Sequence, residues 1–297
     1  FEVEDIERAQ ARFEELRPAP LRIPPNAAMR VAGGDALSRA WLARDSAAIR
    51  GLAAPDFRYE DRGKRALVSG DIETWIDSIM FWPADTRVEA ETTGTLGDRI
   101  SLEDTRWSGA PDGGAFEIER VTVTEVDPAG RLRAVIRFDP DDRGVASAEA
   151  LTRFAAGEAA ATGGVEPCAA YLRAVASRDW ERVRECHAPE AVWVDHRPLG
   201  LGTLDLEQWV ASLRAIDELS ERLSYEILRV LAWNADGLVI AFRRRGTVPD
   251  GGGPFEDGFI VVTINAGDRI QRGEVFAEQD AERAVARFEE LSAAQTT

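Results

Sequence analysis

The sequence predicts an α+β fold that is built twice in succession. Residues 37–79 align without a gap with residues 171–213, at a constant offset of 134 residues. In each copy, apolar residues at helical spacing come first, and short alternating segments separated by turn signals follow. Helices followed by a run of strands are typical of the α+β class, and 297 residues suffice for about two domains.

The predicted elements follow the same order in both copies. A helical pattern that accounts for two helices comes first. A short strand, a third helix and four further strands follow. The helical patterns cover residues 36–52 and 167–186, and the first strands cover residues 57–61 and 192–196. Asp71 and Asp205 precede the third helix in their copies, where each is expected to act as the N-cap. That helix carries Trp75 in one copy and Trp209 in the other.

The two ends of the chain resemble each other. Residues 1–16 and residues 276–291 are identical at eleven of sixteen positions. Residues 1–16 are therefore interpreted as the tail strand and helix of a preceding unit, with upstream domains of the same polypeptide as partners. The alternative is an N-terminal helix of similar composition. The predicted organisation is a tail at residues 1–16, a linker at 17–28, a first domain at 29–154, a linker at 155–166 and a second domain at 167–297.

Composition argues against several classes of function. The 36 basic and 53 acidic residues leave a net charge of −17, which argues against binding to nucleic acid or to an anionic membrane. No apolar run has the length of a membrane span. Two cysteines and two histidines at no recognisable spacing predict neither a disulfide framework nor a metal site. No phosphate-binding loop or other cofactor motif is found, so no cofactor is expected, and the predicted location is the cytoplasm.

Two related sequence segments follow the first helical pattern of each copy: APDFRYEDRGKRA in the first copy and APEAVWVDHRPLG in the second. With the order of elements and the length of each copy, they resemble the NTF2-like superfamily. The nearest branch is the SnoaL-like one, which contains polyketide cyclases, ketosteroid isomerases and limonene-epoxide hydrolases. The resemblance implies tandem cone-shaped barrels, each a bent antiparallel sheet packed on about three helices around an apolar pocket. It also implies a bacterial multidomain protein that carries these domains near its C-terminal end.

The resemblance to ketosteroid isomerases places Asp195 at the catalytic base and Tyr171 at the hydrogen-bond donor to the oxyanion. A carboxylate among apolar walls has a raised pKa and becomes a competent base, while a phenol stabilises the enolate that forms. Strand alternation puts Trp193 on the same face as Asp195, so Trp193 is expected to form a wall of the pocket. The second, protonated acid of those enzymes is missing, because Ile260 falls at its position, or Phe259 if the alignment shifts by one.

Arg244 is the main threat to this interpretation. It alternates in phase with Ile240 and Phe242, so it is expected to face the same interior. There it could pair with Asp195 and turn a base into a structural ion pair.

The first copy has a less complete set of candidate residues. Asp61 matches Asp195, and Tyr59 takes the place of Trp193 on the same strand face. Leu37 replaces Tyr171, so the carboxylate has no oxyanion partner, which indicates binding or scaffolding more than turnover.

Three functions remain open from the sequence. The favoured one is a module that binds a small apolar molecule and serves as a sensor or assembly part of a larger protein. The second is an acid–base enzyme, of the isomerase, cyclase or epoxide hydrolase kind, with its site in the second domain. The third is a purely structural pair of domains that forms an intramolecular pseudo-dimer or contributes to a homo-oligomer.

Overall fold

The computed structural model describes residues 21–64, 67–83, 85–110, 114–249 and 251–295, together with Arg8 and Arg12. The tail helix predicted at residues 1–16 lies outside the described residues apart from those two arginines. Within the described ranges, no helix has both the length and the apolar character that crossing a membrane requires.

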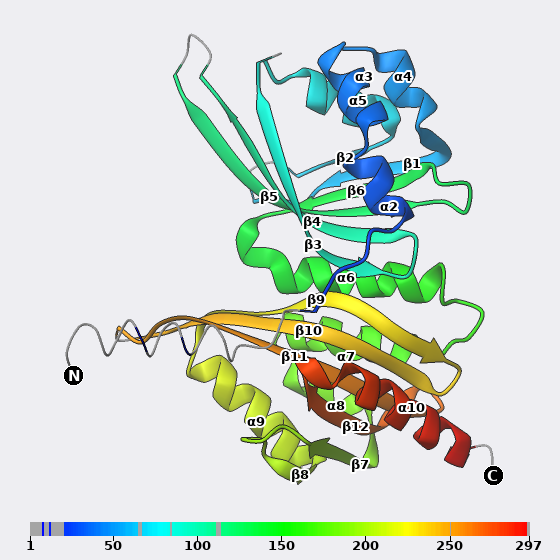
Figure 1. Ribbon diagram of the computed structural model, residues 1–297, viewed down its shortest axis with the longest axis vertical. Helices are drawn as coiled ribbons and strands as arrows, with labels where there is room; N and C mark the ends of the chain where they lie inside the picture. Colours follow the sequence, from blue (N-terminus) through cyan, green and yellow to red (C-terminus); the bar gives the residue numbers. More distant parts are fainter. Residues whose placement is uncertain are drawn as a thin grey trace.

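The elements fall into two groups that follow one another along the chain (Figure 1). The first domain contains α2 (Ala27–Ala32), α3 (Asp35–Leu42), α4 (Ser46–Gly51), β1 (Ala53–Asp61), β2 (Val68–Gly70), α5 (Ile72–Met80), β3 (Arg87–Leu96), β4 (Ile100–Gly109), β5 (Phe116–Val126), β6 (Leu132–Phe138) and α6 (Arg143–Ala156). The second domain contains α7 (Glu166–Ala176), α8 (Trp180–Glu185), β7 (His187–Asp195), β8 (Gly202–Asp205), α9 (Leu206–Glu218), β9 (Glu221–Asn234), β10 (Gly237–Val248), β11 (Gly253–Ala266), β12 (Arg269–Ala277) and α10 (Ala281–Gln295).

The helical pattern at the start of each domain is divided into two helices, in agreement with the predicted order, in which the helix after the first strand is the third. The breaks fall at Arg44 and Arg178, whose φ angles of 54° and 57° are left-handed. A residue in this conformation ends an α-helix. Asp45 and Asp179 then cap the next helix with their side chains. Because both arginines lie at equivalent positions, the two domains share this local geometry as well as their sequence pattern.

The predicted caps of the third helix in each domain are confirmed. The Asp71 side chain accepts hydrogen bonds from the first backbone N–H groups of α5. Asp205 forms a capping box with Gln208 at the start of α9. These caps fix the helices that carry Trp75 and Trp209 over the inner face of the sheet.

The strands form one continuous sheet of two similar halves, in the order β2-β1-β6-β5-β4-β3-β9-β10-β11-β12-β7-β8. Each half is mixed and not purely antiparallel as expected, because β1 pairs with β6, and β7 with β12, in parallel. The halves join through a single parallel pair between Thr95 and Arg229. Next to it, a Cβ on Gly94 would lie 2.1 Å from the carbonyl oxygen of Ile227, so the close approach of the two halves requires glycine.

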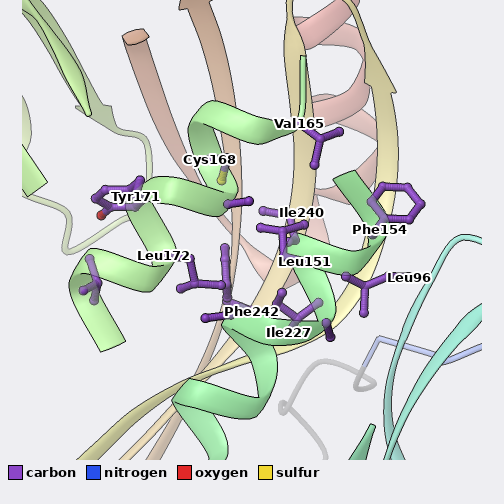
Figure 2. Packing of buried hydrophobic residues seen from close by; sticks show 14 of the residues in the cluster. Leu96, Leu151, Phe154, Val165, Cys168, Tyr171, Leu172, Ile227, Ile240 and Phe242 are labelled. Carbon is purple, nitrogen blue, oxygen red and sulfur yellow. The ribbon is translucent and has the colours of Figure 1, made fainter. Parts of the chain in front are cut away.

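Helix α6 packs between the two domains (Figure 1). It contacts β3, β4 and β5 of the first domain, and β9 and α7 of the second. Figure 2 shows Leu96, Leu151, Phe154 and Ile227 gathered in one buried cluster. Helix α10 covers the corresponding outer face of the second half of the sheet. The inner face of each half, with its own helices, is thereby left to form a separate cone.

Candidate functional site

Side chains on the inner face of the sheet differ sharply between the two cones. In the first domain, directly paired residues form a polar row across four strands. The row runs Asp61 (β1), Arg137 (β6), Thr122 (β5) and Glu103 (β4). The corresponding row of the second domain is Asp195 (β7), Val275 (β12), Val261 (β11) and Ile240 (β10). The second cone therefore keeps only the carboxylate at the end of its row.

The carboxylate of Asp195 is fully occupied by hydrogen-bond donors. Arg197 Nε and Nη2 lie 3.0 and 2.8 Å from its two oxygens. The backbone N–H groups of Arg197 and Leu201 donate to the same oxygens at 3.1 and 3.2 Å. A carboxylate has about four lone-pair sites, so none is left to accept a proton from a substrate.

This environment contradicts the expected rise in the pKa of Asp195. Burial would raise the pKa, but the hydrogen bonds and positive charge of Arg197 outweigh it, and the pKa is lowered. Asp195 is moreover not among the residues that line the cavity of the second cone. Its ion pair with Arg197 makes Asp195 a structural anion. The sequence indicated that the same kind of ion pair could form, but with Arg244 as the partner.

Arg244 faces the interior, as strand alternation predicted, but it does not pair with Asp195. Its Nη2 lies 2.7 Å from Asp257 Oδ2, and Arg197 Nη1 lies 3.2 Å from the same oxygen. Arg197 therefore bridges the two carboxylates and takes the position next to Asp195 that sequence reasoning gave to Arg244.

Aromatic side chains fill most of the second cone. Trp193 on β7 stacks on Trp209 of α9, with ring centroids 3.9 Å apart and planes 7° apart. Trp209 Nε1 donates a hydrogen bond of 3.3 Å to Tyr171 Oη, and the Tyr171 ring lies 5.9 Å from that of Trp193. The cavity that remains has a volume of about 60 Å³. Trp193 and Tyr171 line it as predicted, but it is far below the ~300 Å³ at which ligand pockets usually begin.

Ile260 does not contribute to this cavity. It lies on the outer face of the sheet, in the cluster that α10 covers. Its neighbour Phe259 faces inward, with its ring 5.8 Å from that of Phe242. The prediction that Ile260 lines the ligand pocket is therefore wrong. The neighbouring residue Phe259, which was the alternative, occupies the inner position.

The first cone contains a much larger inner cavity of about 550 Å³. Its walls include Leu37 and Trp41 of α3, Trp75 of α5 and Trp107 of β4. Leu37 stands where the second cone has Tyr171, and no stacked pair like Trp193 and Trp209 fills the centre. The volume lies within the ~300–1,000 Å³ typical of sites for small molecules.

Two residues that line this inner cavity each carry a polar atom without a hydrogen-bond partner. Trp75 Nε1 and Thr86 Oγ1 are buried, and neither makes a hydrogen bond with any described residue. The counterpart of Trp75 is Trp209, whose N–H is satisfied by the hydroxyl of Tyr171. Since Leu37 offers no such oxygen, the same indole donor is left without an acceptor in the first cone.

Arg137 lies at the boundary between the inner cavity and a second, outer one. The outer cavity has a volume of about 740 Å³, and Arg137 and Trp107 line both. The guanidinium carbon lies 5.0 Å from the ring centre of Trp107 and 5.5 Å from that of Tyr59. Nη1 donates a hydrogen bond of 3.2 Å to Tyr59 Oη. The hydroxyl of Tyr59 therefore serves to position Arg137. Asp61 lines only the outer cavity.

Glu103 is the titratable group on the sheet side of the inner cavity. Only 6% of it is exposed. Burial raises the pKa of its carboxyl to about 7. Glu103 is therefore largely protonated below neutral pH, when it can donate a hydrogen bond into the cavity.

Sequence reasoning missed Arg197, Glu103 and Arg137. One signal was present for Glu103, because it alternates with Thr105 and Trp107 along one strand and therefore shares their face. Arg197 follows the end of β7 in a loop, where alternation no longer fixes the direction of a side chain.

Comparison with known proteins identifies part of the chain. Residues 168–273 match the SnoaL-like domain family, which confirms the predicted resemblance for that segment. No protein of curated function matches the sequence. A hypothetical protein from Catenulispora acidiphila with a ketosteroid isomerase-like fold, solved with trimethylamine, is 18% identical and covers 37% of this chain and 84% of its own, with a TM-score of 0.33.

Two further solved structures are similar at the same level. A putative polyketide cyclase, IdmH from Streptomyces antibioticus, is 20% identical over 40% of this chain and 96% of its own, with a TM-score of 0.34. A Mycobacterium tuberculosis protein in complex with estradiol-17beta-hemisuccinate is 18% identical over 38% of this chain and 92% of its own, with a TM-score of 0.31.

Proposed function

With a SnoaL-like domain at residues 168–273 as the starting point, we propose that this protein is a small-molecule-binding module. Its ligand site is the inner cavity of the first domain. The second domain is a filled cone that supports the first through the shared core around α6. In this proposal the protein acts by binding, as a sensor or assembly part of a larger polypeptide, and not by turnover.

The volume of the inner cavity, about 550 Å³ against about 60 Å³ in the second cone, carries this proposal. The N–H of Trp75, which has no acceptor, adds to it. A buried donor without an acceptor costs about 1–3 kcal/mol, and proteins seldom leave one unsatisfied. In the second cone the Tyr171 hydroxyl satisfies the equivalent donor. In the first cone a ligand oxygen that enters the inner cavity would take the place of that hydroxyl. The aromatic walls supply apolar contact for the remainder of the ligand.

The acid–base enzyme has weaker support. A general base must reach the proton that it removes, and Asp195 is sealed by four donors outside a cavity of about 60 Å³. The first cone has a protonatable group in Glu103, but it lacks a counterpart of the Asp195 and Tyr171 pair, because Leu37 stands at the Tyr171 position and Asp61 lines the outer cavity instead of the inner one.

A reciprocal exchange between the two cones tests the proposal. Leu37→Tyr should place a hydroxyl at the wall of the inner cavity, where it supplies Trp75 with an acceptor in place of a ligand oxygen, while Tyr171→Leu should enlarge the cavity of the second cone. Thermal-shift screening with steroids, aromatic alcohols and fatty acyl compounds should find ligands that stabilise the wild type. The same ligands should not stabilise Leu37→Tyr, and should still stabilise Tyr171→Leu. Stabilisation of Leu37→Tyr equal to that of the wild type would place the site elsewhere.

A further inference from the structure

A second feature of the first cone indicates which chemical class it binds. Arg137 is 9% exposed, and no carboxylate of the described residues lies within ion-pair distance of it. Of its five N–H donors, the side chain uses one, for the hydrogen bond to Tyr59 Oη. A buried guanidinium that lines two cavities therefore keeps most of its donors for another partner.

Acidic residues that share the sheet register or the outer cavity with Arg137 form no ion pair with it. Asp61, paired with Arg137 in the sheet register, accepts a hydrogen bond from the backbone of Gly63. Asp139 pairs with Arg120 at 3.4 Å and accepts from the backbone of Lys64. Glu103 lies two strands away, beyond Thr122. None of these groups neutralises the charge of Arg137.

The fold itself does not require an arginine at this position. The equivalent residue in the second cone is Val275, which is buried in an equally complete sheet. The arginines that line the second cavity, Arg197 and Arg244, each pair with a carboxylate. Arg137 differs from them in having no anion, although burial of an unpaired charge is costly.

We propose that the first cone binds an apolar carboxylic acid, with the ligand carboxylate on the Arg137 guanidinium and the apolar body in the inner cavity. This inference rests on the proposed function. A planar guanidinium recognises a planar carboxylate through two parallel N–H···O bonds. Tyr59 and Trp107 hold the guanidinium from its flanks, so its orientation is fixed before the ligand arrives.

Calorimetric titration with two probes of the same shape tests this assignment. The probes are 2-naphthoate, which carries a carboxylate, and 2-naphthalenemethanol, which is neutral. The wild type should bind 2-naphthoate at least tenfold more tightly than the alcohol. Arg137→Met removes the guanidinium and keeps an unbranched side chain, and it should bring the ratio of the two affinities to about one. Arg137→Lys, which keeps the charge without the planar fork, should recover only part of the preference.

The possible failures are distinguishable. Equal affinity of the wild type for both probes would overturn the carboxylate assignment and leave the proposed site intact, provided that Leu37→Tyr abolishes binding of both. Retention of the preference in Arg137→Met would also overturn it. Binding of neither probe to a correctly folded wild type would count against both this assignment and the proposed function. The melting temperature of each variant confirms that it is folded.

Discussion

Replacement of Glu103 by glutamine should stabilise the protein at neutral pH. The carboxyl is buried and its pKa is raised from an ordinary 4.5 to about 7. Between these two values the unfolded chain loses the proton and the folded chain keeps it, so the wild type loses stability as the pH rises. The difference in pKa corresponds to about 3 kcal/mol in the free energy of unfolding. Glutamine does not titrate and avoids this loss.

Unfolding in urea from pH 4 to pH 8, followed by tryptophan fluorescence, measures the effect. The stability of Glu103→Gln relative to the wild type should grow by about 3 kcal/mol between about pH 4.5 and 7 and remain constant above. Arg87 and Arg137 are the other charged side chains that line the inner cavity. Glu91→Gln, on the exposed part of β3, is the matched control and should change stability by less than ~0.5 kcal/mol. A difference between Glu103→Gln and wild type that does not vary with pH would refute the reasoning.

Three further substitutions test the account of the fold. Asp195→Asn should cost about 3 kcal/mol of unfolding free energy, because it breaks a buried ion pair; because the pKa of Asp195 is lowered, this loss should shrink as the pH falls below the ordinary 3.8. Gly94→Ala should cost about 2 kcal/mol in urea unfolding, because its Cβ would overlap the carbonyl oxygen of Ile227, and an unchanged midpoint would contradict the close approach. Leu37→Tyr should raise the unfolding free energy by about 1 kcal/mol through the new acceptor for Trp75, and a lower melting temperature would count against that geometry.

The repeat and the caps could be predicted from the sequence because they depend on local spacing. Asp71 and Asp205 cap their helices wherever the rest of the fold lies. The faces of strands were less predictable, because a shift of one residue exchanges inside and outside, and Ile260 was misplaced in this way. The ion pair and the lowered pKa of Asp195 depend on Arg197. The position of Arg197 is set by a loop and not by a periodic element.

Which cone is open could not be predicted, because volume depends on how aromatic side chains from different elements meet. Trp209 and Trp193 are separated in sequence, and their stacking follows from the distance between α9 and the sheet. The sequence showed that Leu37 stands at the position of Tyr171, and we interpreted this change as the loss of a catalytic partner. In the structure Leu37 lines the inner cavity of about 550 Å³.

The location of a bound ligand tests the central claim most directly. A crystal of the protein soaked with 6-bromo-2-naphthoate would show the bromine by its anomalous scattering. The account predicts a single bromine site in the inner cavity of the first domain, which Leu37, Trp41 and Trp75 line, with the carboxylate within hydrogen-bond distance of Arg137. A bromine site beside Trp193 and Tyr171 in the second cone, with the first cone empty, would contradict it.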